Sequence, residues 1–228
     1  MNIKIVGAAA AVALFGLAPV AAQASSILVA DPLFTTLPVG GLSYTLPGIY
    51  GGGTYSVAAI PGWSTAQGQT SGQFDPAGDV FNGNPIPGGG LVAFTNGGPI
   101  SQTVGPTAAV GDTYTLTVYV GEWNQSYLPY NSGDVTLDVG GHVINATGTP
   151  PASGSWSLYT ATYTAVAGDA GAPITIVLND ATAQGDFTDV QLTVVPEPAT
   201  WAMLLLGVGM MGGGLRAARR KLALSPIR

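Results

Sequence analysis

The stretch Gly111-Asp-Thr-Tyr-Thr-Leu-Thr-Val-Tyr-Val120 decides the fold, because apolar and polar side chains alternate along it. One side of this extended chain carries only large apolar residues, namely Tyr114, Leu116, Val118 and Val120. The other side carries threonines at positions 113, 115 and 117. A period of two is typical of a β-strand with one buried face. The stretch therefore predicts a strand that covers an apolar core.

The same alternation recurs elsewhere in the chain. It is present in residues 135–139 and 189–194, and residues 91–94 and 174–178 form shorter apolar runs. Gly140-Gly141 predicts a two-residue hairpin turn. No part of residues 25–195 keeps a helical period, and strands with one apolar face bury it against a second sheet. The sequence predicts an all-β antiparallel sandwich.

The N-terminus has the features of a secretory signal peptide. Lys4 precedes an apolar run over residues 5–22, and Ala22-Gln23-Ala24 provides small residues for cleavage by signal peptidase. We expect residues 1–24 to be removed, although a membrane anchor is the alternative. Residues 25–195 are then one domain, long enough to bury about 70% of its unfolded surface.

The charges are unevenly distributed. Every lysine and arginine lies in the end segments: Lys4, Arg216, Arg219, Arg220, Lys221 and Arg228. Residues 25–195 contain eleven acidic residues and no basic one, so no side chain there can neutralise phosphates. This excludes nucleic acid as a partner. The chain also has no cysteine, so no disulfide stabilises it.

The C-terminal segment, residues 196–228, begins with Pro196-Glu197-Pro198. Residues 199–215 are uncharged and would span about 26 Å as a transmembrane helix. Arg216, Arg219 and Arg220 follow and predict a cytoplasmic end.

These three parts in this order resemble the PEP-CTERM sorting signal of Gram-negative bacteria. The resemblance implies export across the inner membrane and processing by an exosortase. It places the protein at the cell surface or in the extracellular matrix, and a plain transmembrane anchor is the alternative.

A second resemblance covers most of residues 25–195. Five segments are similar to motifs of galactose-binding-like jelly rolls, in the same order: Asp31-Pro-Leu-Phe34, Pro61-Gly-Trp63, Gly111-Asp-Thr-Tyr-Thr-Leu-Thr-Val118, Trp156-Ser-Leu-Tyr159 and Phe187-Thr-Asp-Val-Gln-Leu192. In such domains, acids of the first and last strands can bind a structural calcium ion. Asp31 and Asp189 are the matching candidates, although Thr188 replaces an acid of the family pattern. We take Trp63 and Trp156 as core residues.

Few residues in the body could support catalysis. His142 is the single histidine and follows the Gly140-Gly141 turn, so neither a catalytic triad nor a zinc site is expected. Only a carboxylate pair remains, as in glycoside hydrolases, formed by Glu122 with Asp134 or Asp138. We therefore expect a protein that is not an enzyme.

The segment of residues 121–131 is the candidate ligand site. It combines aromatic rings with amides and a carboxylate, which suits stacking and hydrogen bonding to a sugar. Its candidate residues are Glu122, Trp123, Asn124, Gln125, Tyr127 and Tyr130. We expect an exposed Trp123 ring and binding of glycan or exopolysaccharide. The alternatives are a ring that caps the sandwich edge, and a structural matrix or biofilm protein that has no small ligand.

Overall fold

The computed structural model describes residues 22–65, 70–124, 135–180 and 184–197, together with residues 207 and 209. The chain divides into two units. Residues 23–197 form one of them, and this unit is the β-sandwich body. The other unit comprises Met1–Ala22 and Pro198–Arg228, of which Ala22 and the helical Gly207 and Gly209 are described. The predicted signal peptide, apart from residues 22–24, and the predicted transmembrane segment, apart from residues 207 and 209, lie outside the described residues. Within the described part, no helix is long and apolar enough to cross a membrane.

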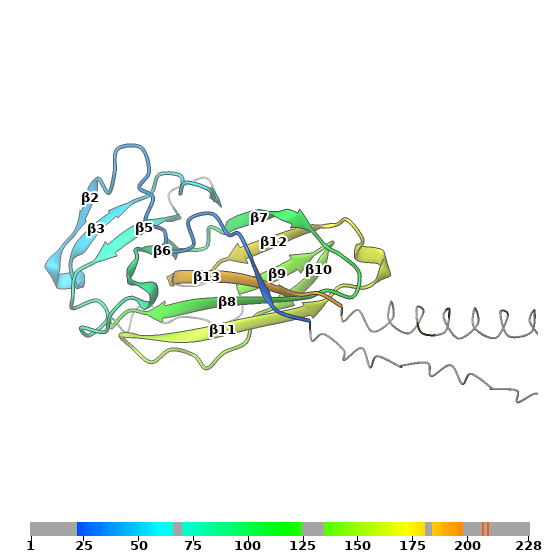
Figure 1. The fold of residues 1–228 in the computed structure, drawn as a ribbon. Coiled ribbons are helices and arrows are strands. Elements are labelled where there is room, and N and C mark those ends of the chain that lie inside the picture. The colour runs from blue at the N-terminus through cyan, green and yellow to red at the C-terminus, as the bar shows by residue number, and fades with distance from the viewer. Residues whose placement is uncertain are drawn as a thin grey trace, which may run out of the picture. The chain divides into compact units, whose positions relative to one another are not determined.

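The body consists of two antiparallel sheets, as the alternating sequence predicted (Figure 1). The larger sheet has eight strands: β11 (Ser155–Thr164), β8 (Thr113–Glu122), β13 (Gly185–Val195), β6 (Val92–Thr95), β5 (Ser71–Pro76), β3 (Gly53–Ser56) and β2 (Tyr44–Leu46) in spatial order, with β1 (Ser25–Ile27) paired to β13. The smaller sheet has the order β10 (His142–Asn145), β9 (Val135–Val139), β12 (Pro173–Leu178), β7 (Ile100–Thr107) and β4 (Ser64–Thr65). Three short 3-10 turns, η1 (Gly48–Tyr50), η2 (Pro87–Gly89) and η3 (Ala167–Asp169), complete the described elements.

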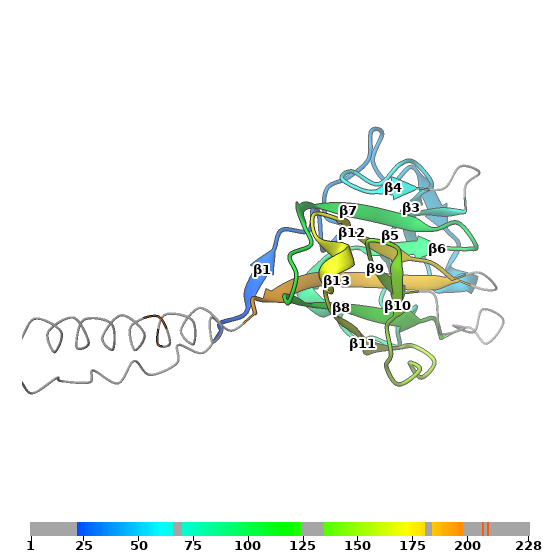
Figure 2. The same ribbon diagram turned by 90° about the vertical axis from the view of Figure 1, so that its right-hand side faces the viewer.

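The main core lies between the two sheets, which Figures 1 and 2 show as layers. The predicted inward residues of β8, from Tyr114 to Val120, are all buried in it. The smaller sheet contributes the buried side chains of β9 and β12, among them Leu137 and Ile176. Gly140 and Gly141 form the predicted hairpin turn between β9 and β10, and both have positive φ. The predicted sandwich and its core face are therefore confirmed.

The opposite face of the larger sheet carries a second apolar cluster. On β6, Ala93 belongs to the main core, whereas its neighbours Val92 and Phe94 belong to this second cluster. Because successive side chains of a strand point to opposite faces, the second cluster lies on the side turned away from the smaller sheet. We call it the outer cluster.

Candidate functional site

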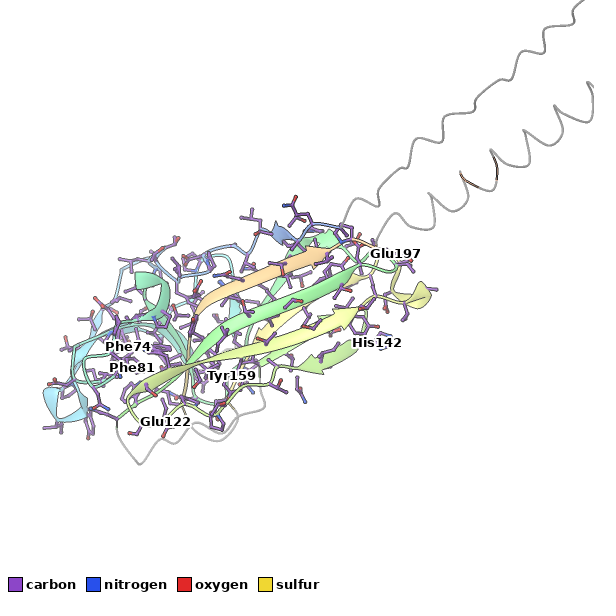
Figure 3. The ribbon with its side chains drawn as sticks, turned by 60° about the horizontal axis from the view of Figure 1, so that its bottom comes forward. Phe74, Phe81, Glu122, His142, Tyr159 and Glu197 are labelled. Carbon is purple, nitrogen blue, oxygen red and sulfur yellow. The ribbon has the colours of Figure 1, made fainter. Side chains whose placement is uncertain are left out.

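The outer cluster is aromatic, and it contains the candidate site. Its buried members are Phe74, Val80, Phe81, Val92, Phe94 and Trp123, and partly buried side chains such as Tyr55 and Trp156 pack against them. Figure 3 shows Phe74, Phe81 and Glu122 at one end of the body and His142 and Glu197 at the other. The site is therefore remote from the end of the body that leads into the C-terminal segment.

A glycine makes room for these rings. A Cβ on Gly121 of β8 would lie 2.7 Å from the Trp156 ring and 2.9 Å from the Phe81 ring. These two rings also contact each other, with centroids 4.4 Å apart. The close approach of rings and backbone requires glycine at this position.

Trp123 is buried, contrary to our expectation of an open ring face. Its side chain is 6% exposed and packs against Phe74 with a centroid distance of 5.4 Å. The next residue, Asn124, forms hydrogen bonds to the loop at residues 79–82. Its backbone N–H donates to the Val80 carbonyl at 3.0 Å, and its side-chain amide donates to the Asp79 carbonyl and to Asn82 Oδ1. Both amide hydrogens of Asn124 therefore serve the fold.

A pocket of about 310 Å³ opens beside Trp123. It is lined mainly by apolar and aromatic side chains, with two amides among them: Leu46, Tyr55, Val57, Phe74, Phe94, Asn96, Trp123 and Gln184. Small-molecule sites have this character, with apolar walls and a few polar groups that fix orientation. We call it the outer pocket.

Asp186 adjoins three residues of the outer pocket. It is paired across the sheet with Phe94, and its Oδ1 accepts a hydrogen bond from Gln184 Nε2 at 3.2 Å. The indole N–H of Trp123 also favours the ionised form of this carboxyl, which places the ring nitrogen beside it. Sequence reasoning did not identify Asp186, Gln184 or Asn96. The one signal in the sequence was an acid directly before the predicted last strand; the structure shows that every residue of Gly185-Asp-Phe-Thr188 is buried.

Burial favours the protonated form of the Asp186 carboxyl. Its side chain is completely buried, and this desolvation raises the pKa of Asp186 to about 8. The Gln184 and Trp123 donors lower the pKa by less, and the negative charge of Asp180 raises it further. The Trp123 indole N–H faces the Asp186 carboxyl, although the contact between Trp123 Nε1 and Asp186 Oδ2 falls short of good hydrogen-bond geometry. A carboxyl that retains its proton beside an aromatic pocket can act as an acid.

None of the other predicted ligand residues that the structure describes is found in the lining of the outer pocket. Glu122 is partly buried, which raises the pKa of its carboxyl. Glu122 is absent from the lining of the outer pocket, as is Asn124. Gln125, Tyr127 and Tyr130 lie outside the described residues.

The structure does not bring Glu122 and Asp138 together as the predicted hydrolase pair. Asp138 Oδ1 accepts the Gly141 N–H at 2.8 Å, in the turn that precedes His142. This turn lies at the end of the body opposite Glu122 (Figure 3). The other candidate partner, Asp134, lies outside the described residues.

The two calcium candidates lie on neighbouring segments. The Val190 N–H donates to the Pro32 carbonyl at 3.0 Å, so the first and last strands are adjacent where the resemblance places them. The Asp31 carboxylate accepts hydrogen bonds from the backbone N–H groups of Thr35 and Thr36, and Asp189 Oδ1 accepts one from Gln191. Calcium takes six to eight oxygen ligands, and these two side chains provide at most four. No group of three or more potential ligand side chains occurs in the described part, so the calcium site stays a prediction.

His142 is a surface residue with a structural contact. Its side chain is 54% exposed, lies 3.3 Å from the buried Asp169 carboxylate and stacks on Tyr163. Hydrogen bonds from the Val166 N–H and the Tyr163 hydroxyl lower the pKa of Asp169, and the nearby imidazole lowers it further. These contacts join the β9–β10 turn to η3.

The sorting signal follows directly after β13. The Glu197 N–H donates to Asp112 Oδ1 at 3.2 Å, and the Glu197 side chain lies against Gly111. The remaining predicted residues of the signal, Pro198, Arg216, Arg219 and Arg220, lie outside the described residues. Residues 194–221 match the PEP-CTERM protein-sorting motif. This match supports an exported protein that an exosortase processes.

Two solved structures share the fold of the body. A Stig cyclase, Fisc from Fischerella sp. TAU, in complex with (3Z)-3-(1-methyl-2-pyrrolidinylidene)-3H-indole, is 21% identical with a TM-score of 0.59. The alignment covers 76% of this chain and 99% of the cyclase. A second cyclase structure from Fischerella sp. TAU is 21% identical with a TM-score of 0.58, and 76% and 98% of the two chains are covered. No curated protein matches the chain.

Residues 47–193 match the family described as HpiC1 cyclase, HpiC1-like, and this span is well over half of the chain. The match corrects two expectations. The body is not supported as a galactose-binding-like domain, although the all-β sandwich is confirmed. The prediction that the protein is not an enzyme is wrong, because the family and the two similar structures are cyclases. The chain belongs to the HpiC1-like cyclase family.

Proposed function

We propose that the body is a cyclase that binds its substrate in the outer pocket and starts ring closure with a proton from Asp186. The observation that carries this proposal is the fully buried Asp186 carboxyl, with its pKa raised to about 8, which lies behind Trp123 and Gln184 of the pocket wall and does not itself line the pocket. A general acid works best when its pKa lies near the operating pH. Asp186 meets this condition, and Glu122 is the one other described carboxyl with a raised pKa.

The chemistry conserves atoms and electrons. A proton passes from Asp186 to an unsaturated atom of the substrate, which leaves a carboxylate and a substrate cation. An internal double bond then attacks the cationic centre and forms the new ring bond. Loss of a proton from the cyclised cation to the Asp186 carboxylate restores the acid, so the product is an isomer of the substrate.

The pocket walls suit such a cation. The faces of Tyr55, Phe94 and Trp123 carry the negative ring quadrupoles that attract positive charge. The apolar lining also limits water, which would otherwise capture the cation. Gln184 holds Oδ1 of the carboxyl, so the proton is carried on Oδ2.

The charge pattern narrows the substrate class. Residues 25–195 contain no lysine or arginine, so no side chain there could hold an anionic leaving group such as a diphosphate. The similar cyclase from Fischerella was solved with an indole compound. We therefore propose an uncharged aromatic substrate of the alkenyl-indole type.

Turnover tests this proposal directly. Full-length chain is incubated with 3-alkenyl indoles, and ring closure is detected as a change of chromatographic retention at unchanged mass. Asp186→Asn should lower the rate by about 10²–10⁴-fold, the usual contribution of a general acid. Asp75→Asn removes an exposed carboxyl on β5 and should leave the rate unchanged. Equal rates for Asp186→Asn and the wild type would contradict the assignment.

We further propose that the mature body acts at the cell surface or in the extracellular matrix, where the sorting motif would direct it. Glu197→Ala should block exosortase processing and leave membrane insertion intact. Normal release of this variant from membranes would favour a plain anchor. No specific observation favours glycan binding as a second function, because Trp123 is buried and the Asn124 amide is engaged within the fold.

A further inference from the structure

Gln184 both lines the outer pocket and holds the buried carboxyl behind it. Its side chain is 9% exposed and belongs to the pocket wall, whereas Asp186 is 0% exposed and does not line the pocket. Gln184 Nε2 donates a hydrogen bond to Asp186 Oδ1 at 3.2 Å. Gln184 therefore stands between the carboxyl and the space that a ligand would occupy.

The backbone next to Gln184 is tightly packed, which fixes the amide in this place. Gly185 pairs with Thr95 across the sheet. A Cβ on Gly185 would lie 2.8 Å from the Phe187 ring and 3.0 Å from the Cβ of Asp180. Only the side chain of Gln184 is free to change its rotamer without a shift of this backbone.

The other wall residue beside the carboxyl is less able to move. The Trp123 ring packs against Phe74, with ring centroids 5.4 Å apart, and both rings belong to the outer cluster. Because Asp186 does not line the pocket, a wall side chain has to turn aside before a ligand touches the carboxyl. The unbranched side chain of Gln184 meets this requirement with the least repacking.

One charged group acts on Asp186 besides its hydrogen-bond donors. This is Asp180, whose negative charge raises the pKa of Asp186. Tyr55 is the ionisable residue of the pocket wall. Glu122 of β8 follows Gly121, the partner of Asp186 across the sheet, so the Glu122 side chain leaves the strand on the opposite face.

Two effects of Gln184 on Asp186 have opposite signs. Burial is the largest influence and raises the pKa of Asp186, and the hydrogen bond from Gln184 is smaller and lowers it. The amide contributes to both, because it keeps pocket water away from the carboxyl and also donates to it. Entry of water should therefore outweigh the loss of one hydrogen bond.

We propose that Gln184 is the positioning residue of Asp186: its amide holds Oδ1, separates the carboxyl from pocket water, and marks the point in the wall at which the carboxyl can reach a ligand. The first two roles are independent of any reaction, and only the third rests on the proposed function. After proton transfer, the same N–H would stabilise the carboxylate that remains, since a donor favours the ionised form.

Two substitutions of Gln184 separate the barrier from the hydrogen bond. Gln184→Met keeps an unbranched side chain of similar length and removes the donor, so the Asp186 midpoint should rise by about one pH unit. Gln184→Ala opens the wall to water, so the midpoint should fall by at least about one unit from its value of about 8. The midpoints are read from carboxyl ¹³C shifts of the full-length chain.

Asn96→Ala is the matched control. Asn96 is the other amide of the pocket wall, it is exposed, and it is not among the groups that shift the pKa of Asp186. Its removal widens the pocket and should leave the midpoint unchanged. Unaltered methyl resonances of Leu116 and Ile176 show that the main core of each variant is folded. Gln184→Asn, which shortens the amide by one methylene group, replaces Gln184→Ala if that variant does not fold.

Three results would overturn the inference: shifts of the same sign in Gln184→Met and Gln184→Ala, no shift in either variant, or an equal fall in Asn96→Ala. Turnover tests the proposed function separately. Opposite shifts at Gln184 combined with normal turnover by Asp186→Asn would uphold this inference and reject Asp186 as the acid. Shifts of the same sign combined with slow turnover by Asp186→Asn would reject this inference and retain the acid.

Discussion

Residues 186 and 187 are neighbours on β13, yet they face two very different environments. Phe187 points into the core between the sheets, among aliphatic side chains such as Leu116 and Ile176. Asp186 is paired with Phe94 and lies under the aromatic outer cluster, with the Trp123 indole N–H and the Gln184 amide beside its carboxyl. The first environment contains only apolar contacts, and the second places an ionisable carboxyl among aromatic rings and two donors. The comparison shows that one face of the larger sheet builds the inter-sheet core, whereas the other buries a carboxyl beside an aromatic pocket, where we propose the chemistry takes place.

The largest expected effect comes from the inter-sheet core. Phe187→Ala removes a fully buried ring, so it should lower the free energy of unfolding by about 3–5 kcal/mol. Trp123→Phe keeps a ring in the outer cluster and should cost less than about 1.5 kcal/mol. Urea unfolding of both variants compares them. A larger cost for Trp123→Phe would contradict the division between the two faces.

The next effect is a pH dependence that Asp186 imposes on stability. Its pKa is raised in the folded state, so the native protein holds a proton that the unfolded chain releases above about pH 4. The stabilisation is complete below the unfolded pKa and is lost as the pH rises through about 8. Between these limits the slope is about 1.4 kcal/mol per pH unit.

Asp186→Asn should remove this slope, as seen in urea unfolding between pH 5 and pH 8. Asp169 does not mask the effect. Its pKa is lowered in the folded state, so its contribution to the free energy of unfolding is lost only as the pH falls towards acid values. Asp75→Asn serves as the control and should keep the wild-type slope. An unchanged slope in Asp186→Asn would show that this carboxyl ionises normally.

A smaller effect on stability is expected at Gly121, where the backbone of β8 contacts the rings of the outer cluster. Gly121→Ala places a methyl group within 2.7 Å of the Trp156 ring and 2.9 Å of the Phe81 ring. Overpacking of this kind costs about 1–3 kcal/mol. Gly141→Ala is a control in open space, although its positive φ carries some strain. Thermal unfolding that ranks the two variants equally would argue against tight packing over Gly121.

The smallest effect concerns calcium. If Asp31 and Asp189 bind the ion, calcium at ten times its Kd should stabilise the chain by about 1.4 kcal/mol. Asp189→Asn should abolish the rise in melting temperature. The site would be rejected if magnesium at equal ionic strength produced the same shift.

The fold could be predicted because its information is local. Alternation within residues 113–120 and 135–139 identified the buried side chains, and Gly140-Gly141 identified a turn. The resemblance to jelly-roll motifs also predicted the adjacency of the Asp31 and Asp189 segments, which the bond from the Val190 N–H to the Pro32 carbonyl confirms.

The site could not be predicted because it depends on distant segments that meet on one face. Trp123 was expected to be exposed, but the loop at residues 79–82 covers it through bonds that no local pattern reveals. Asp186 looked like an ordinary strand residue, because its burial depends on Phe94 and on neighbours from β8. The lack of histidine and cysteine argued against catalysis only for mechanisms that need them. A lone buried carboxyl was not considered.

The most direct test of the account is the titration of Asp186 itself. Carboxyl ¹³C chemical shifts of the full-length chain, compared with those of Asp186→Asn, identify its resonance and its midpoint. The account predicts a midpoint near pH 8, as burial beside the outer pocket requires. A midpoint near 4, the value of an exposed aspartate, would mean that the carboxyl is ionised at neutral pH and cannot be the acid.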